Sequence, residues 1–110
     1  MRWHFGWAGC AVTLIATFAV AAPALTAREK RGAALLERMC SSCHAVGRTG
    51  VSPHRGAPPF RTLSTRYAIE SLEDKLAQGV ISGHPDMPEF KFGAADIGAV
   101  IAYLRVIQEP

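Results

Sequence analysis

The most specific chemistry in this chain lies in one short run, Cys40-Ser-Ser-Cys43-His44. Two thiols three positions apart can each add to one vinyl group of a haem and form thioether bonds, and the next residue can then present an imidazole nitrogen to the iron. A Cys-x-x-Cys pair also occurs in thioredoxin-like redox sites and in halves of zinc sites. A zinc site needs further ligands, of which the chain after the run offers only His54 and His84, and a thioredoxin-like site needs a preceding strand. The run therefore predicts one covalently bound haem c, with His44 as an iron ligand.

The sixth position of that iron decides between electron transfer and chemistry on a small molecule. Met87 is the expected ligand, because it lies 43 residues after His44 in a loop where Pro85 and Pro88 would fix the backbone without helix or strand. A methionine between prolines in a polar segment has no periodic apolar face to join, which argues against an ordinary core methionine. A soft thioether would favour ferrous iron and raise the reduction potential. The other candidates for this position are Met39, His54 and His84.

The first 27 residues differ from the rest of the chain and predict a Sec-type export signal. Arg2 gives a positive start, no charged residue lies between Phe5 and Val20, and Ala22-Pro23-Ala24 has the small-x-small pattern of a cleavage site. We expect cleavage after Ala24 or Ala27 and export to the periplasm. An uncleaved membrane anchor is the alternative, because the apolar segment is about as long as the shortest helix that spans a bilayer.

Residues 28–110 then form one domain, of a size at which an apolar core alone stabilises a fold only marginally. A disulfide between Cys40 and Cys43 is conceivable in an exported protein, but so small a loop would add less stability than a buried cofactor. Cys10 is expected to leave with the signal. The net charge of the chain is +3, or +2 without Arg2, and its cations do not cluster, which argues against a nucleic-acid partner.

The segments around these residues predict an all-α domain with about three main helices and no strand. Apolar residues recur at helical spacing in three segments, 29–39, 69–78 and 94–107. The expected core-facing positions are Ala33, Leu36, Met39, Ile97, Val100, Ile101 and Leu104. Ile69, Leu72 and Leu76 share one face of the second segment. Gly79 suits the end of the second helix, and a short helical turn is expected at 60–63. The remaining long loops, 45–59 and 80–92, are unusual in so small a domain and indicate segments that wrap something.

These residues resemble the small class I cytochromes c of bacteria, over essentially all of 28–110. Cys40-Ser-Ser-Cys43-His44 matches the haem-attachment motif of that family, and Asp86-Met87-Pro88 is similar to the segment with its distal ligand. Ala57-Pro58-Pro59-Phe60 is similar to its Gly-Pro-x-Leu segment. The resemblance implies the cytochrome c fold, with long loops around one haem, and assigns to the Pro58 carbonyl a hydrogen bond from His44 that would orient the ring and raise its basicity. Because alanine replaces the usual glycine, Pro58 and Pro59 both stay open.

The resemblance also implies a close crossing of the first and last helices. Gly32 and Leu36 would meet Val100 and Tyr103 there, although an aromatic residue is commoner at the position of Leu36 and leucine at that of Val100. An ordinary core position is the alternative for Tyr103. Gly93 precedes the last helix without a Ser, Thr or Asp to cap it.

With His44 and Met87 both on the iron, no coordination site is open, and the haem can only exchange single electrons with partners at its exposed edge. The predicted function is an electron carrier rather than an enzyme, with larger redox proteins as transient partners. Four cations could add positive charge near that edge, namely Arg55, Arg61, Lys75 and Lys91. One alternative is a haem subunit of a larger dehydrogenase or oxidase complex. The other is an enzyme or gas sensor in which Met87 is displaced.

Overall fold

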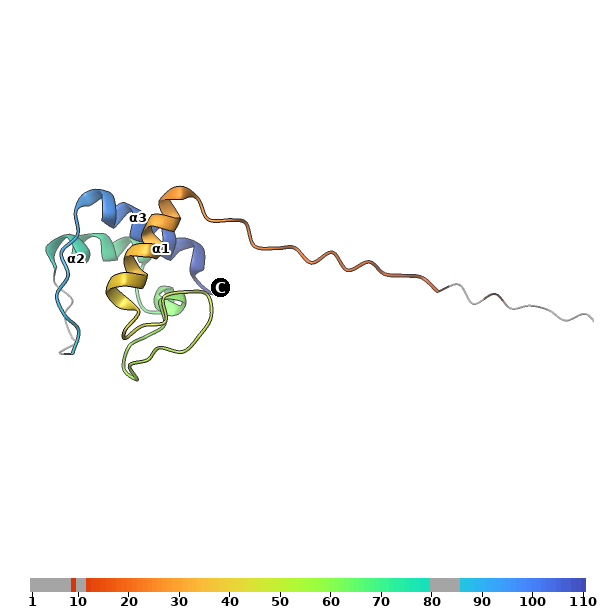
Figure 1. The fold of residues 1–110 in the computed structure, drawn as a ribbon, viewed down its shortest axis with the longest axis horizontal. Coiled ribbons are helices and arrows are strands. Elements are labelled where there is room, and N and C mark those ends of the chain that lie inside the picture. Colours follow the sequence, from red (N-terminus) through yellow and green to blue (C-terminus); the bar gives the residue numbers. More distant parts are fainter. Residues whose placement is uncertain (1–8, 10–11, 80–85) are drawn as a thin grey trace, which may run out of the picture.

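The described part of the chain is helical and contains no strand, as predicted. The computed structural model describes residues 9, 12–79 and 86–110 (Figure 1). Its elements are α1 (Ala27–Cys40), the 3₁₀ helices η1 (Phe60–Thr65) and η2 (Ile69–Ser71), α2 (Leu72–Gln78) and α3 (Ala94–Ile107). The bounds of α3 are those expected from the sequence. The second expected helix is divided, because its first turn is 3₁₀ and only the part from Leu72 is α-helical.

The first helix begins two residues earlier than expected, because its cap was not recognised. Thr26 lies just before α1, and its Oγ1 accepts a hydrogen bond of 3.2 Å from the backbone N–H of Glu29. The Glu29 carboxylate accepts one of 2.7 Å from the backbone N–H of Thr26 in return. This reciprocal pair is a capping box, which satisfies two donors that a helix start leaves without partners. Leu25, one residue further out, is partly buried against the core.

The Thr26→Ala variant is expected to lose about 1 kcal/mol of unfolding free energy, since it leaves the Glu29 N–H at the start of α1 without its side-chain acceptor. A denaturant titration of the haem-loaded protein measures this loss. Thr49→Ala is the matched control, because Thr49 is exposed in the loop after α1 and its replacement should leave the midpoint unchanged. Equal midpoints for the two variants would contradict the capping role.

The core forms where α1 crosses α3. Gly32 is buried at this crossing, and a Cβ atom there would overlap the carbonyl oxygen of Ala99 in the backbone of α3. Only a hydrogen atom fits between the two helices, so the close crossing expected at Gly32 is confirmed. Tyr103 lies beside it, and its hydroxyl donates a hydrogen bond of 2.9 Å to the carbonyl oxygen of Val46.

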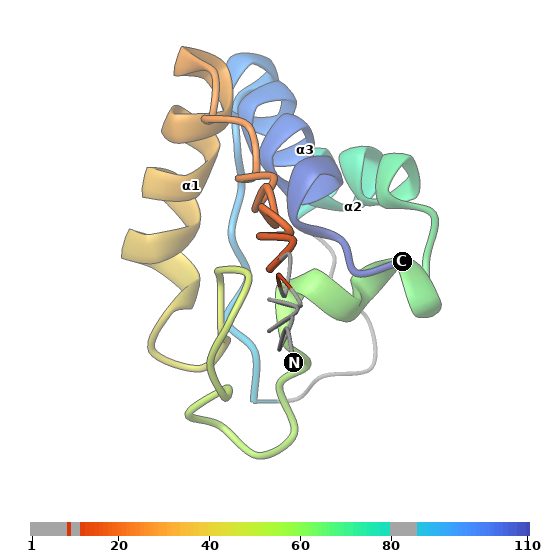
Figure 2. The same ribbon diagram turned by 90° about the vertical axis from the view of Figure 1, so that its right-hand side faces the viewer.

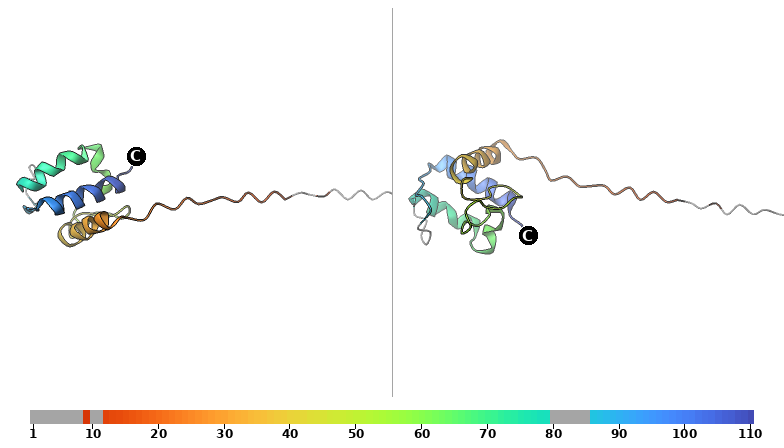
Figure 3. Two further views of the ribbon diagram at one scale, coloured as in Figure 1. Left: turned by 90° about the horizontal axis from the view of Figure 1, so that it is seen from above. Right: turned by 60° about the horizontal axis from the view of Figure 1, so that its bottom comes forward.

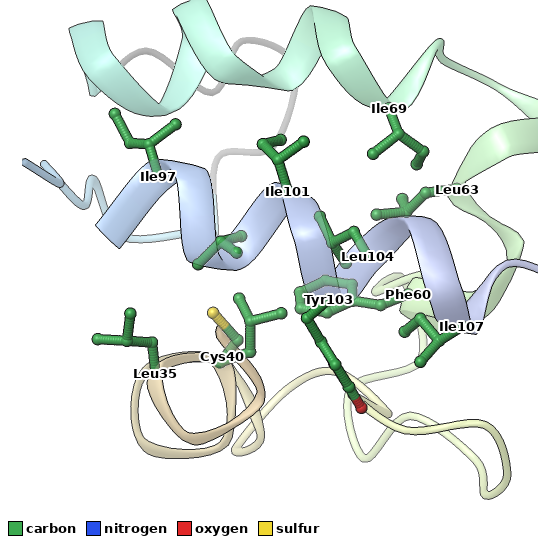
Figure 4. Packing of buried hydrophobic residues seen from close by; sticks show 12 residues of the cluster. Leu35, Cys40, Phe60, Leu63, Ile69, Ile97, Ile101, Tyr103, Leu104 and Ile107 are labelled. Atoms are coloured by element: carbon green, nitrogen blue, oxygen red, sulfur yellow. The ribbon is translucent and has the colours of Figure 1, made fainter. Parts of the chain in front are cut away.

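Most positions expected to face the core are buried, and Figure 4 shows how they pack around α3. The buried set comprises Leu35, Leu36, Cys40, Phe60, Leu63, Ile69, Ile97, Val100, Ile101, Tyr103, Leu104 and Ile107. Four residues of the predicted apolar faces are partly buried and pack against this core, namely Ala33, Met39, Leu72 and Leu76. Three of these four, Met39, Leu72 and Leu76, also line a cavity.

The helices α1 and α2 lie on opposite sides of α3, and the views in Figure 3 and Figure 4 agree on this. Gly79 ends α2 in the left-handed region, with φ of 71°, as expected of a glycine at this place. The loop from 41 to 59 runs below α1 and returns to η1, as Figure 2 shows. The end of α1, this loop and α2 all contribute side chains to one cavity.

Polar contacts of the residues that follow α3 connect this helix to η1. The Gln108 amide donates hydrogen bonds of 2.8 Å to the carbonyl oxygens of Phe60 and Leu104, and its own oxygen accepts one from the backbone N–H of Ser64. Arg61 forms an ion pair of 2.9 Å with Glu109. These bonds fix the position of η1, which forms one wall of the cavity.

Candidate functional site

The structure brings the predicted functional residues to one cavity of about 310 Å³. Cys40, Cys43 and His44 line it from the end of α1 and the turn that follows, and Met87 lines it from the segment before α3. Pro58 lines it from the loop before η1. Residues from distant parts of the sequence therefore meet around one space, although Met87 is 43 positions from His44.

The turn after α1 presents the two thiols and the imidazole. The backbone N–H groups of Cys43 and His44 both donate to the carbonyl oxygen of Cys40, at 3.1 and 2.9 Å, so the chain keeps turning after the helix ends. The two thiols are not joined in a disulfide. Burial, together with the neighbouring Cys43, raises the pKa of the Cys40 thiol to about 11.

His44 is buried, and its ring is fixed from one side by a backbone carbonyl. Nδ1 lies 2.8 Å from the carbonyl oxygen of Pro58. A carbonyl oxygen can only accept a hydrogen bond, so Nδ1 carries a proton, and in the neutral ring Nε2 then keeps a free lone pair. An imidazole in this state can bind a metal ion. The carbonyl of Pro59 accepts instead from Thr62, which leaves Pro58 as the partner of His44.

Phe60 was not recognised as a site residue from the sequence. Its ring lies against that of His44, with centroids 4.5 Å apart and planes inclined by 34°. Its backbone N–H donates to the carbonyl oxygen of Ala45, and its carbonyl accepts from Gln108. The apolar residue that follows the two prolines in the Gly-Pro-x-Leu-like segment was the available signal for Phe60. No sequence signal pointed to Gln108.

Met87 is half-buried and lines the cavity together with Pro88, Phe90 and Phe92. Met39 also lines the cavity and adjoins Cys40 in the sequence. The segment 80–85, with His84 and Pro85, lies outside the described residues.

His54 lines the cavity as well, but its side chain is 46% exposed and its Nε2 lies 3.7 Å from a carboxylate oxygen of Asp86. Across residues 12–79 and 86–110, no three His, Cys, Asp or Glu side chains gather as a zinc site would require. His44 and Met87 both line the cavity, and their pairing on one iron stays a prediction.

Comparison with known proteins identifies the family. Residues 27–104 match the family model described as cytochrome c oxidase, cbb3-type, subunit III. The chain belongs to the c-type cytochromes. It is 31% identical to cytochrome c-552 of Bradyrhizobium diazoefficiens, over 83% of this chain and 86% of that protein. It is also 36% identical to cytochrome c6 of Picosynechococcus sp., over 86% of both chains, and 36% identical to cytochrome c6 of Nostoc sp., over 68% of this chain and 65% of the relative. No solved structure matches significantly.

Membership confirms the resemblance to a small monohaem cytochrome c of class I and the all-α cytochrome c fold. Cytochromes c carry a covalently bound haem c, and Cys40 and Cys43 fit its attachment motif. They transfer electrons, so the prediction that this protein is not an enzyme is confirmed as well.

The cavity of this cytochrome fits such a group. Its remaining wall is largely apolar and includes Leu36, Leu63, Leu72, Leu76, Phe92, Val100 and Leu104. A flat apolar macrocycle can bury its faces against such side chains and shield them from water.

Of the four cations expected near the haem edge, Lys75 lines the cavity. Arg61 is not among the residues that line the cavity, and it forms an ion pair with Glu109. Arg55 and Lys91 are exposed and lie outside the cavity wall. The structure adds Arg66, which the sequence did not single out.

Proposed function

We propose that this cytochrome is an exported single-electron carrier, with its haem attached to Cys40 and Cys43 and its iron bound by His44 and Met87. The observation that carries the proposal is that these four side chains line one cavity. The free Nε2 lone pair of His44, fixed by the hydrogen bond to Pro58, supports the proximal role. The soft sulfur of Met87 supports the distal role.

Two filled axial positions leave the haem with one-electron exchange as its chemistry. His44 is fixed by the Pro58 carbonyl on one side and by the Phe60 ring on another, so it needs little rearrangement when the oxidation state changes. The apolar wall excludes water from the faces of the haem. A rigid and dry environment of this kind suits electron transfer with larger redox proteins, which bind transiently at the exposed edge.

We further propose that the chain is exported to the periplasm and that residues 1–27 contain the signal. Support comes from the described part of the leader, where Val12, Leu14, Ile15, Phe18 and Val20 are 82–95% exposed and make no core contact. Within residues 12–79 and 86–110, no helix has both the length and the apolar character needed to cross a bilayer.

Of the two cleavage points expected from the sequence, the one after Ala24 fits the fold better. Cleavage there would keep Leu25, which packs against the core, and Thr26, which caps α1. Cleavage after Ala27 would remove both. The intact mass of the purified protein should therefore correspond to a chain that begins at Leu25.

A haem c subunit of a larger complex is the second candidate, because the matching family model is described as an oxidase subunit. A stable subunit would need an exposed apolar patch for its partner. In the described part of the domain after the leader, the exposed large apolar side chains are Val51 and Tyr67, which do not form such a patch. The free carrier is therefore the better supported of the two.

The test is expression of the full chain in a cell with a haem-attachment system. We expect a periplasmic protein of monomer size, with reduced c-type bands that survive acid-acetone extraction and a ferric sulfur-to-iron charge-transfer band. A colourless protein with two alkylatable thiols would overturn the proposal. Quantitative recovery in a stable complex with other redox proteins would favour the subunit function.

A further inference from the structure

The segment that carries Met87 has few polar contacts with the rest of the fold. In the described part of the chain, no hydrogen bond joins residues 86–92 to another segment. One pair of titratable side chains does, since a carboxylate oxygen of Asp86 lies 3.7 Å from Nε2 of His54. Phe92 packs against the core, so the segment is held by apolar packing at one end and by this pair at the other.

His54 is fixed in the loop that follows the two cysteines. Its backbone N–H donates to the carbonyl oxygen of Cys43 at 3.1 Å, and its own carbonyl accepts from the backbone N–H of Ala57 at the same distance. These two hydrogen bonds set the position of His54 relative to Cys43. The imidazole is therefore presented from a backbone that belongs to the haem-attachment turn.

The hydrogen bonds of the His54 ring also decide where its proton lies. The backbone N–H of Gly56 donates to Nδ1 at 3.1 Å. A ring nitrogen that accepts a hydrogen bond carries no proton, so the proton of the ring is on Nε2. Nε2 is the nitrogen that lies 3.7 Å from the Asp86 carboxylate. This distance exceeds that of a direct hydrogen bond, so the contact is an electrostatic one between an N–H group and a carboxylate.

This contact connects two segments that lie on the same cavity. Cys43, His54, Asp86 and Met87 all line it, and Asp86 directly precedes Met87 in the chain. The His54 and Asp86 side chains are 46% and 79% exposed, and an exposed pair adds little to the stability of a whole domain. A local opening costs less free energy than global unfolding, however, so a weak contact can still change how often one segment opens.

We propose that His54 is a positioning residue for the distal ligand, which acts through Asp86 to keep Met87 on the iron and the sixth position closed to other ligands. The proposal rests on the proposed ligation of the iron by His44 and Met87. His54 is not itself a ligand here. A protein that lacks the contact therefore keeps Met87 on the iron at rest, but it exchanges Met87 for an added ligand more readily.

The test is the binding of imidazole to the ferric, haem-loaded protein at pH 8, followed by loss of the sulfur-to-iron band. Imidazole binds only where Met87 has left the iron, so its apparent affinity reports how often the segment opens. His54→Ala and Asp86→Ala should each raise that affinity about threefold, as expected for an exposed electrostatic contact. The double variant should rise little further, because either change removes the whole contact. His54→Gln should restore most of the parent affinity, since its amide supplies an N–H donor.

Glu89→Ala is the matched control, because Glu89 is an exposed acid of the same segment and lies outside the cavity wall. It removes the same charge as Asp86→Ala and should leave the imidazole affinity unchanged. If the single variants behave like Glu89→Ala, or if their effects multiply in the double variant, the proposal fails while the carrier function stands. A parent protein without the sulfur-to-iron band would instead overturn the ligation by Met87, and this proposal with it.

Discussion

The Met87→Ala variant is expected to keep its haem and to lose roughly 0.2 V of reduction potential, a fraction of the ~0.8 V range over which axial ligands set the potential of haem iron. The covalent links through Cys40 and Cys43 do not depend on Met87, so attachment should persist. Loss of the thioether removes a soft ligand that favours ferrous iron and opens the sixth position to harder ligands. Spectroelectrochemical titration measures the potential. The sulfur-to-iron band should be absent, and added cyanide should bind.

Met39→Leu is the matched control, because Met39 also lines the cavity but adjoins Cys40. It should keep both the band and the potential. The His54→Asn variant examines the other described candidate for the sixth position, and it should likewise keep the band. Retention of the sulfur-to-iron band in Met87→Ala, or its loss in Met39→Leu, would move the distal ligand to another residue.

The Gly32→Ala variant is expected to lose about 3 kcal/mol or more of unfolding free energy, which is a large share of the stability of a small domain. Its methyl group would meet the Ala99 carbonyl oxygen, and a backbone atom inside a packed helix cannot turn aside as a side chain can. The α1 and α3 helices would have to separate. Because α1 carries Cys40 at its end and α3 contributes Val100 and Leu104 to the cavity wall, the separation should also loosen the haem site. Denaturant titration of the haem-loaded protein gives the loss.

Gly98→Ala provides a control at a second helical glycine. A Cβ atom at Gly98 would overlap only the guanidinium of Arg28, which is the movable end of a long side chain on the surface. Alanine also has the higher helix propensity, so stability should stay equal or rise by up to about 1 kcal/mol. Equal losses at the two glycines would mean that the crossing at Gly32 is not the limiting contact.

Local features of the sequence predicted the elements of this fold with small errors. The spacing of Ile97, Val100, Ile101 and Leu104 predicted α3 at its observed bounds, because a 3.6-residue period is a property of the helix itself. The start of α1 was placed two residues late, since the Thr26 and Glu29 pair was not recognised as a cap. The shared apolar face of Leu72 and Leu76 was predicted, and both side chains pack against the core while they also line the cavity. Helical periodicity identifies an apolar face, but it does not say whether that face contacts protein or lines a cavity.

The attachment site could also be predicted, because Cys40, Cys43 and His44 are neighbours in sequence and their spacing is dictated by haem chemistry. The choice between Pro58 and Pro59 could not be predicted from the sequence, since it depends on which of the two carbonyl groups points toward His44 in the folded loop. The sequence also did not predict that the Phe60 ring packs against the imidazole. Nor did it predict that hydrogen bonds of Gln108 connect η1 to α3.

The sequence alone thus determined the helices, the thiols and the imidazole, because those features follow from local spacing and from the chemistry of adjacent residues. Tertiary structure decided which distant side chains share the cavity. It placed Met87 at the same space as His44, and it brought Arg66 and Lys75 to the wall of that space. These relations depend on how α1, α3 and the loops pack around the Gly32 crossing, and no short stretch of sequence contains that information.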